Sequence, residues 1–285
     1  MKELIINLCP TGMIPTKEMT RHVPISPDEI AKDVLRCVGL GVSMVHIHPR
    51  DEHGEPTTQK ESYSAIIKKI REKDTNVVIC ATTSGRRDNT FEGRSQVLEL
   101  EGDLKPDMAS LTLSSLNFNK QASMNSPDMI QSLAKKMLEK GIKPELEVFD
   151  IGMINYAKYL IKKDLLKPPY YFNLLLGNIA CAQADLINVG LMIRELPENS
   201  VWSLAGIGNS QLQINSLGVV WNCGVRVGLE DNIWLDAART QLASNEQLVK
   251  RIVDLAHTFG RPIITSEKLR EYLGLGVGNG YYGAV

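Results

Sequence analysis

The sequence predicts an α/β protein built as a single (β/α)8 TIM barrel. Eight short apolar segments alternate with eight segments of helical periodicity, and no change in composition divides the chain. Strands that alternate with helices imply a parallel sheet, and eight such units close most simply into a barrel. The length of 285 residues fits one barrel, which typically needs about 250 residues. A doubly wound open sheet is the alternative.

Each predicted strand is a short run of apolar and β-branched residues. The eight runs cover residues 4–8, 44–48, 77–81, 108–113, 146–149, 170–175, 201–205 and 224–227. We assign residues 1–273 to a catalytic barrel domain and residues 274–285 to a glycine-rich C-terminal tail.

Capping signals mark two of the predicted helices. Ser26-Pro27-Asp28-Glu29 combines an N-cap serine, a proline at the first helical position and a glutamate at the third. Ser126-Pro127-Asp128 repeats the start, and Lys140-Gly141 ends that helix with a basic last turn and a glycine stop. Periodicity predicts the other helices over 60–73, 92–101, 154–163, 180–193, 212–219 and 246–259.

Charge and composition narrow the class of protein. A formal net charge of -1 gives no electrostatic footprint for nucleic acid or for an anionic membrane surface, and no apolar stretch is long enough to span a bilayer. No signal-peptide pattern follows Met1. Five scattered cysteines without a C-x-x-C pair indicate reduced thiols. We therefore expect a cytoplasmic enzyme that binds neither nucleic acid nor membrane.

Two histidines lie two positions apart at the end of the second predicted strand. Side chains alternate along a strand, so His46 and His48 point to the same face and can reach one metal ion. The remaining three histidines show no such pairing. A single histidine on an apolar strand is usually a core residue, but two in register before a polar turn favour metal ligation.

Glu230, after the eighth predicted strand, is the expected third ligand. Two imidazoles need at least one further protein ligand, and a carboxylate leaves positions open for substrate. The same ligand set suits non-haem iron, so the residues do not fix the metal; zinc is favoured if the chemistry is Lewis-acid rather than redox. The alternative is that Glu230 and Asp231 merely stabilise the N-terminus of a helix expected after Asn232.

Three further charged residues lie in predicted strands or directly beside one. Arg226 lies at an apolar strand end, so it needs an anionic partner, either a protein carboxylate or a substrate carboxylate. Glu145 and Glu147 have apolar neighbours, and at least one should point into the barrel mouth as a general base or a partner of Arg226. The alternative is a structural ion pair inside the barrel.

The glycines after the seventh predicted strand form a weaker signal. Gly206-Ile207-Gly208, followed by Asn209, could let backbone amides approach a phosphate where barrels often bind one. The segment lacks the full dinucleotide fingerprint.

Five motifs together resemble the β-keto acid cleavage enzymes, whose best-known member acts on 3-keto-5-aminohexanoate. The resemblance runs from the first strand to the helix after the eighth. The motifs are Pro10-Thr11-Gly12-Met13-Ile14-Pro15-Thr16-Lys17, His46-Ile47-His48-Pro49-Arg50-Asp51, Thr83-Ser84-Gly85-Arg86, Lys143-Pro144-Glu145-Leu146-Glu147-Val148-Phe149-Asp150 and Arg226-Val227-Gly228-Leu229-Glu230-Asp231.

The resemblance implies a zinc-dependent, oligomeric barrel enzyme, with a tetramer favoured. It would react a β-keto acid with acetyl-CoA to give acetoacetate and a new acyl-CoA, through a metal-stabilised enolate and retro-Claisen cleavage. Carried over by position, His46, His48 and Glu230 would bind zinc. Asp231, held by Arg226 and Glu147, would be the general base.

The resemblance also implies ligand-contacting positions. Substrate would contact the strand-end residues Thr82, Ser84, Gly85 and Ser110, and acetyl-CoA would lie near Gly206, Gly208 and Asn209. Ile14 occupies the place of a carboxylate that receives the substrate's amino group in the lysine-fermentation enzyme. An isoleucine cannot pair with an ammonium, so we expect a β-keto acid with an uncharged tail. The alternative is that Ile14 only packs and Glu18 or another acid binds the amine.

Two other functions remain open from the residues alone. A metal-dependent aldolase or decarboxylase would share the enolate chemistry but would not consume acetyl-CoA. A metal- or CoA-binding regulatory protein would need a second module, which the sequence does not indicate. A hydrolase of the amidohydrolase type would need further histidines on later strands. The later strands carry none, because His257 lies on a predicted helix.

Overall fold

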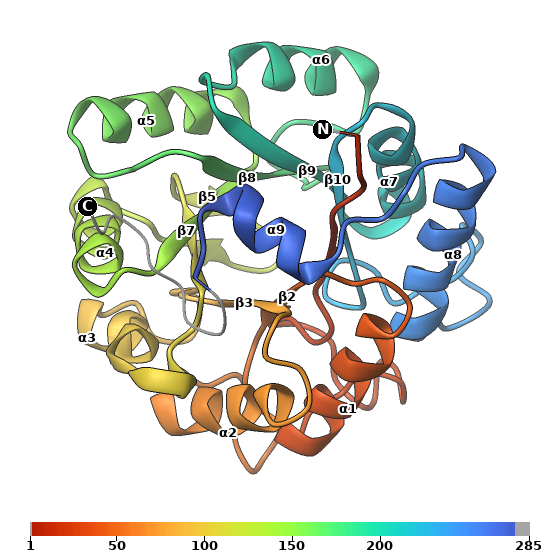
Figure 1. Cartoon of the computed structure of the whole chain (residues 1–285), viewed down its shortest axis with the longest axis horizontal. Coiled ribbons are helices and arrows are strands. Elements are labelled where there is room, and N and C mark those ends of the chain that lie inside the picture. Colours follow the sequence, from red (N-terminus) through yellow and green to blue (C-terminus); the bar gives the residue numbers. More distant parts are fainter. Residues whose placement is uncertain (1, 277–285) are drawn as a thin grey trace.

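A closed parallel barrel forms the centre of the protein in the computed structural model, which describes residues 2–276 (Figure 1). Within these residues, eight strands follow one another around the barrel, in the order β1, β2, β3, β4, β7, β8, β9 and β10, with β10 pairing back to β1. Their bounds are Ile6–Leu8, Met44–Ile47, Val78–Ala81, Met108–Thr112, Lys143–Val148, Tyr170–Leu176, Ser200–Gly206 and Gly224–Val227. The predicted (β/α)8 barrel is confirmed.

Helices surround the barrel, and Figure 1 shows them as an outer ring. The α-helices of this ring are α1 Pro27–Val38, α2 Lys60–Arg71, α3 Phe91–Ser95, α4 Pro127–Lys140, α5 Ile151–Lys162, α6 Leu186–Glu195, α7 Gln211–Val220 and α8 Asn245–Thr258. Short 3₁₀ turns, η1 Gln96–Glu99, η2 Gly102–Leu104 and η3 Gly208–Ser210, complete the connections. No helix among residues 2–276 combines the length and apolar character needed to cross a membrane.

Both predicted capping motifs form. The Ser26 hydroxyl accepts from the Glu29 amide at 3.2 Å, and the Glu29 carboxylate accepts from the Ser26 amide at 3.1 Å. Ser126 caps α4 through the Met129 amide, and Gly141 ends it with φ at 65°. These local interactions fix where the two helices begin because they satisfy amides that lack partners within the helix.

Several predicted helix bounds were wrong. The helix predicted over 180–193 begins only at Leu186, because the side chain of Asp185 accepts from the Asn188 amide as the N-cap. The helix predicted over 92–101 divides into α3 and η1. No helix follows Asn232 directly, since α8 begins at Asn245. The helix-terminus alternative for Glu230 and Asp231 is therefore excluded.

A hairpin and a helix were not predicted. A hairpin of β5 Leu116–Asn117 and β6 Ala122–Ser123 follows β4 at the barrel mouth. Helix α9, Ser266–Leu273, lies across the centre of the ring in Figure 1 and closes the other end of the barrel. Leu269 packs into the apolar barrel interior, and Arg270 pairs with Asp107 at 2.9 Å next to the start of β4. Most of the predicted tail, residues 277–285, lies outside the described residues.

The barrel interior changes from apolar to polar along the strands. Near α9 it is filled by side chains such as Met44, Val78 and Tyr171. One step further along the strands, alternate positions bring polar groups inward, among them His46 and Glu145. The strands thus carry the candidate site residues at their carboxyl ends, the face where barrel active sites are built.

Candidate active site

His46 and His48 face one another at the end of β2. Their Nε2 atoms lie 3.1 Å apart, and both side chains are buried. The Nε2 atom of His48 is also 3.3 Å from a carboxylate oxygen of Glu230, which arrives from the loop after β10. The structure therefore brings together the three residues that the sequence predicted as metal ligands.

Glu145 on β7 orients the His46 ring through its Nδ1 atom. Its carboxylate accepts from His46 Nδ1 at 2.5 Å, from Asn7 at 2.8 Å, from Asn173 at 2.5 Å and from the Cys80 thiol at 3.1 Å. With Nδ1 donating to Glu145, Nε2 is the nitrogen that can offer its lone pair to a metal ion once its own proton is lost, as metal-binding histidines commonly do. Burial opposes ionisation of Glu145, but His46 and the hydrogen bonds outweigh it and lower its pKa to about 2.

Glu230 is held against the loop that follows β1. A Cβ atom added to Gly12 would lie 2.4 Å from Cγ of Glu230, and Gly12 has φ at 68°, so a glycine is needed at this contact. The guanidinium of Arg50 fixes the same loop by donating to the carbonyls of Gly12 at 2.6 Å and Pro15 at 3.0 Å. Burial opposes the charge of Glu230, but Arg226 and the two histidines hold its pKa well below the usual range.

These donor atoms fit a divalent cation. The nitrogen donors of His46 and His48 and a Glu230 oxygen lie within 4.8 Å of one another, and Oε2 of Glu230 is buried without a hydrogen-bond partner among residues 2–276. Two imidazoles and one carboxylate are a common catalytic zinc set. A second grouping of His46, Cys80 and Glu145 fits less well. Burial raises the pKa of the Cys80 thiol well above its usual range, and a thiol ligand must be deprotonated.

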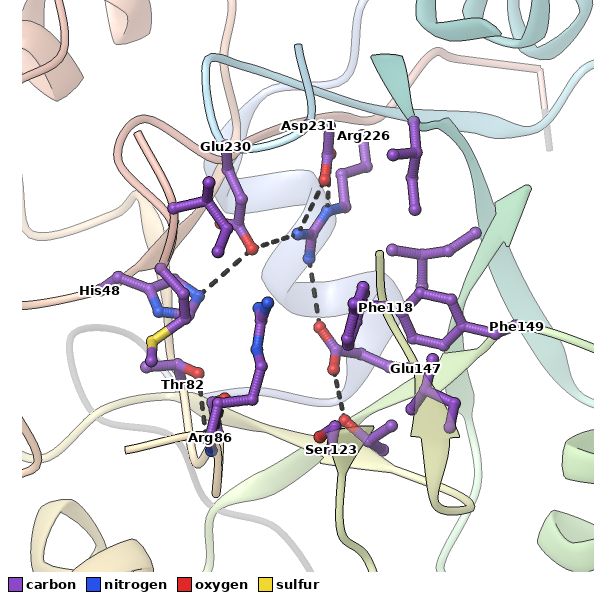
Figure 2. A pocket seen from close by; sticks show the side chains of 17 residues that line it. His48, Thr82, Arg86, Phe118, Ser123, Glu147, Phe149, Arg226, Glu230 and Asp231 are labelled. Carbon is purple, nitrogen blue, oxygen red and sulfur yellow. Dashed lines mark hydrogen bonds and ion pairs between the residues drawn. The ribbon is translucent and has the colours of Figure 1, made fainter. Parts of the chain in front are cut away.

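Arg226 on β10 joins three carboxylates beside this site. It contacts Asp231 at 3.1 Å, Glu147 at 3.3 Å and Glu230 at 2.7 Å, as the dashed lines of Figure 2 show. Thr112 donates to the other oxygen of Glu147 at 2.7 Å. The predicted grouping of Arg226, Glu147 and Asp231 thus forms, and Glu145 belongs to His46 instead.

Asp231 has the environment expected of a general base. Burial raises its pKa above the usual value, although Arg226 opposes the shift. A buried carboxylate with raised basicity accepts a proton more readily than a solvated one. The thiol of Cys9 lies 3.7 Å from Asp231 on the side of β1.

A pocket opens above these residues (Figure 2). Its polar lining includes His48, Thr82, Ser84, Arg86 and Glu147. A second set of side chains, which we call the apolar wall, consists of Met13, Ile14, Leu116, Phe118, Phe149, Leu175 and Ile207. Ile14 lines the pocket as predicted from its position, whereas Glu18 is not among the lining residues. The hairpin residues of the wall were missed because the hairpin itself was not predicted.

The predicted substrate-contacting residues divide into two groups. Thr82 and Ser84 line the pocket, but Gly85 and Ser110 are not among its lining residues. The Ser110 hydroxyl instead accepts from the Thr83 amide at 3.1 Å, which fixes the end of β3. A Cβ atom on Gly85 would lie 2.6 Å from Asn89, so this glycine permits the tight loop. Substrate contacts at Gly85 and Ser110 stay a prediction.

The glycine turn after β9 supports the loop that carries Asp231. The Gly208 amide donates to the Asp231 carbonyl at 2.7 Å, and Asn209 accepts from Arg239 at 3.0 Å. A Cβ atom on Gly206 would lie 2.4 Å from the Ser210 carbonyl oxygen. The Gly208 amide is thus already occupied, and CoA binding at this turn stays a prediction.

Comparison with known proteins identifies the family. A family model described as beta-keto acid cleavage enzyme matches residues 3–275. The chain belongs to the beta-keto acid cleavage enzyme family. This match confirms the resemblance drawn from the five motifs.

Beta-keto acid cleavage enzymes and related proteins resemble the chain over nearly its full length. A 3-keto-5-aminohexanoate cleavage enzyme of Fusobacterium nucleatum is 37% identical over 277 residues, which cover 96% of this chain and 99% of the relative. A 3-oxoadipate:acetyl-CoA acetyltransferase of Cupriavidus necator is 30% identical over 95% of this chain and 94% of the relative. The solved apo structure of ObcA matches with a TM-score of 0.79 at 20% identity, over 90% of this chain and 66% of that chain, which supports the fold.

Proposed function

We propose that this protein is a zinc-dependent β-keto acid cleavage enzyme that transfers an acyl group between a β-keto acid and acetyl-CoA. The observation that carries the proposal is the contact between two sets of residues. The His46, His48 and Glu230 donors converge on one point, and Arg226 joins Glu230 to Asp231 and Glu147 beside it. A cation site next to a buried base suits proton abstraction from the carbon between a keto group and a carboxylate.

The protein's own groups account for the first step. Zinc, when held by His46, His48 and Glu230, supplies positive charge that stabilises negative charge on the substrate oxygens. Asp231 accepts the proton from the carbon between the keto group and the carboxylate, and the substrate becomes an enolate. Arg226 donates to both oxygens of Asp231, so it fixes the direction in which the base points.

The remaining steps exchange the acyl group of the β-keto acid for the acetyl group of acetyl-CoA. The enolate carbon bonds to the acetyl carbonyl carbon of acetyl-CoA, and CoA leaves as a thiolate. The thiolate then attacks the original keto carbon, and the bond between that carbon and the former enolate carbon breaks. The products are a new acyl-CoA and the enolate of acetoacetate, which takes back the proton from Asp231. Pairing with Glu147 holds Arg226 in place throughout.

The names of the relatives support acetyl-CoA as the second substrate, since one of them is a 3-oxoadipate:acetyl-CoA acetyltransferase. They differ in the keto acid. The apolar side chain of Ile14 makes an ammonium-bearing acid a poor match for this pocket. We further propose a homo-oligomer, with a tetramer favoured, and a cytoplasmic location.

An assay of product formation tests the function. Zinc-loaded protein, a β-keto acid and acetyl-CoA should give acetoacetate and an acyl-CoA, and omission of acetyl-CoA should stop acetoacetate release. Consumption of the keto acid at the same rate without acetyl-CoA would contradict the proposal and would identify an aldolase or decarboxylase.

A further inference from the structure

Arg86, in the loop after β3, places a cation in the pocket that has no hydrogen-bonded or ion-paired carboxylate among residues 2–276. Figure 2 shows its side chain between the His48–Glu230 side and the Phe118–Glu147 side. Its guanidinium carbon lies 4.4 Å from the centre of the Phe118 ring. Among residues 2–276 the guanidinium makes no hydrogen bond or ion pair with a carboxylate, so its donors remain free for a ligand.

The other cation of the pocket is already occupied. Arg226 donates to Asp231, Glu147 and Glu230, which are the three acidic residues among the described part of the chain that line the pocket. A ligand anion that enters can therefore pair with Arg86 without displacing a carboxylate of the protein. Arg87 differs from its neighbour, because its side chain is 59% exposed and lies 3.9 Å from Glu55.

A neutral ligand would leave Arg86 in an unfavourable state. The apolar wall, which includes Phe118 and Ile14, offers no anion to the guanidinium. A substrate that fills the pocket displaces water from this cation, and burying an unpaired charge is costly. Burial already lowers the pKa of Arg86, although Glu230 and Glu147 oppose the shift. The free cation therefore favours a ligand that brings its own negative charge.

The ligands of the proposed reaction offer three candidate anions. The phosphates of acetyl-CoA are separated from its thioester by the long, uncharged pantetheine arm, so they do not reach a residue beside the reacting carbons. The carboxylate common to all β-keto acids is expected at the cation site with the keto oxygen. An anionic group at the far end of the substrate is the candidate left for Arg86.

We propose that Arg86 binds a second carboxylate, so that the preferred substrate is a β-keto dicarboxylic acid. This inference rests on the proposed function. It replaces the sequence-based expectation of an uncharged tail, which considered Ile14 alone. Both residues disfavour an ammonium, but only Arg86 distinguishes a carboxylate from a neutral group, through paired charge-assisted hydrogen bonds.

The test compares two six-carbon acids that differ at one end, 3-oxoadipate and 3-oxohexanoate. Their binding to zinc-loaded protein is measured by calorimetry without acetyl-CoA, and kcat and KM are measured with it. The wild type should bind 3-oxoadipate more tightly. Arg86→Met should weaken 3-oxoadipate binding about 10- to 100-fold and leave 3-oxohexanoate nearly unchanged. The affinity of Arg86→Lys for 3-oxoadipate should lie between those of the wild type and Arg86→Met. The neighbouring Arg87→Met is the matched control, and its affinities should resemble those of the wild type.

Each result separates this proposal from its rivals. An equal loss for both acids in Arg86→Met would overturn it, because Arg86 would then bind the shared carboxylate. A change in the KM of acetyl-CoA alone, or a wild-type preference for 3-oxohexanoate, would overturn it as well. Selective binding of 3-oxoadipate without any product would support the Arg86 assignment and contradict the proposed function.

Discussion

Replacement of Glu145 by Gln should weaken zinc binding while the barrel stays folded. One oxygen of Glu145 accepts from Asn7 and Asn173, and the other accepts from His46 and Cys80. A glutamine offers only one acceptor oxygen. If its amide nitrogen faces His46, two donors meet, and the imidazole must move its proton from Nδ1 to Nε2, where it blocks the metal.

The expected magnitude follows from this loss of orientation. Removal of an outer partner of a metal-binding histidine commonly costs 10- to 100-fold in metal affinity, which corresponds to about 1.4–2.7 kcal/mol. Competition with a chelator of known zinc affinity measures the change, and a thermal melt shows whether the variant is folded. A zinc affinity equal to that of the wild type in a folded Glu145→Gln variant would show that Glu145 does not orient His46 toward the metal.

Glu147→Gln is the matched control, because Glu147 lies two positions further along β7 on the same face. It contacts Arg226 and Thr112 and neither histidine. We expect this variant to keep its zinc affinity and to lose turnover, since Arg226 would be held less firmly beside Asp231. The opposite pattern, with zinc lost at position 147 and turnover lost at position 145, would contradict the assignment of the two carboxylates.

Three further predictions test neighbouring parts of the site. Asp231→Asn should retain zinc and lower turnover about 10²- to 10⁴-fold, because it removes the proton acceptor; metal analysis and steady-state kinetics check this. Gly12→Ala should lower zinc affinity in a folded protein, because the added Cβ would lie 2.4 Å from Cγ of Glu230 and must displace it. Zinc binding at pH 7 should release about one proton, measured by calorimetry in buffers of different ionisation enthalpy. Burial opposes the charge on His46 but Glu145 raises its pKa to about 9, whereas burial lowers the pKa of His48 to about 4, so only His46 must lose a proton.

The proton count has a defined dependence on pH. A metal binds the neutral imidazole, so zinc affinity should rise with pH up to about 9 and level off above it, where His46 is already neutral. Release of two protons at pH 7, or of none, would contradict the charge states of His46 and His48. Unchanged exchange of the substrate's acidic proton with solvent in Asp231→Asn would show that another group is the base. Full zinc binding by Gly12→Ala would show that the loop after β1 does not position Glu230.

The sequence predicted the barrel and the pairing of His46 with His48 because these depend on local patterns. His46 and His48 share a face through the alternation of side chains in one strand, and the Ser26 cap depends on residues three positions apart. Arg226 at a strand end required an anion, and the barrel supplies three. The hydrophobic pattern therefore located the ends of the strands, and the candidate site residues lie at those ends.

The features that the sequence did not reveal depend on contacts between distant segments. Glu145 and Glu147 have the same local pattern, and only the barrel register shows that one contacts His46 and the other Arg226. The hairpin of β5 and β6 is too short to give a periodic signal, so Phe118 was missed. Helix α9 is held in place by the ion pair of Arg270 with Asp107, which are 163 positions apart.

The proposed function depends on a single zinc site formed by His46, His48 and Glu230 beside Asp231. Anomalous diffraction at the zinc absorption edge, from crystals of zinc-loaded protein, tests it most directly. We expect one strong peak within bonding distance of Nε2 of His46, Nε2 of His48 and a carboxylate oxygen of Glu230. A peak at Cys80 and Glu145 instead, or no peak near the two histidines in a preparation that cleaves β-keto acids, would contradict it.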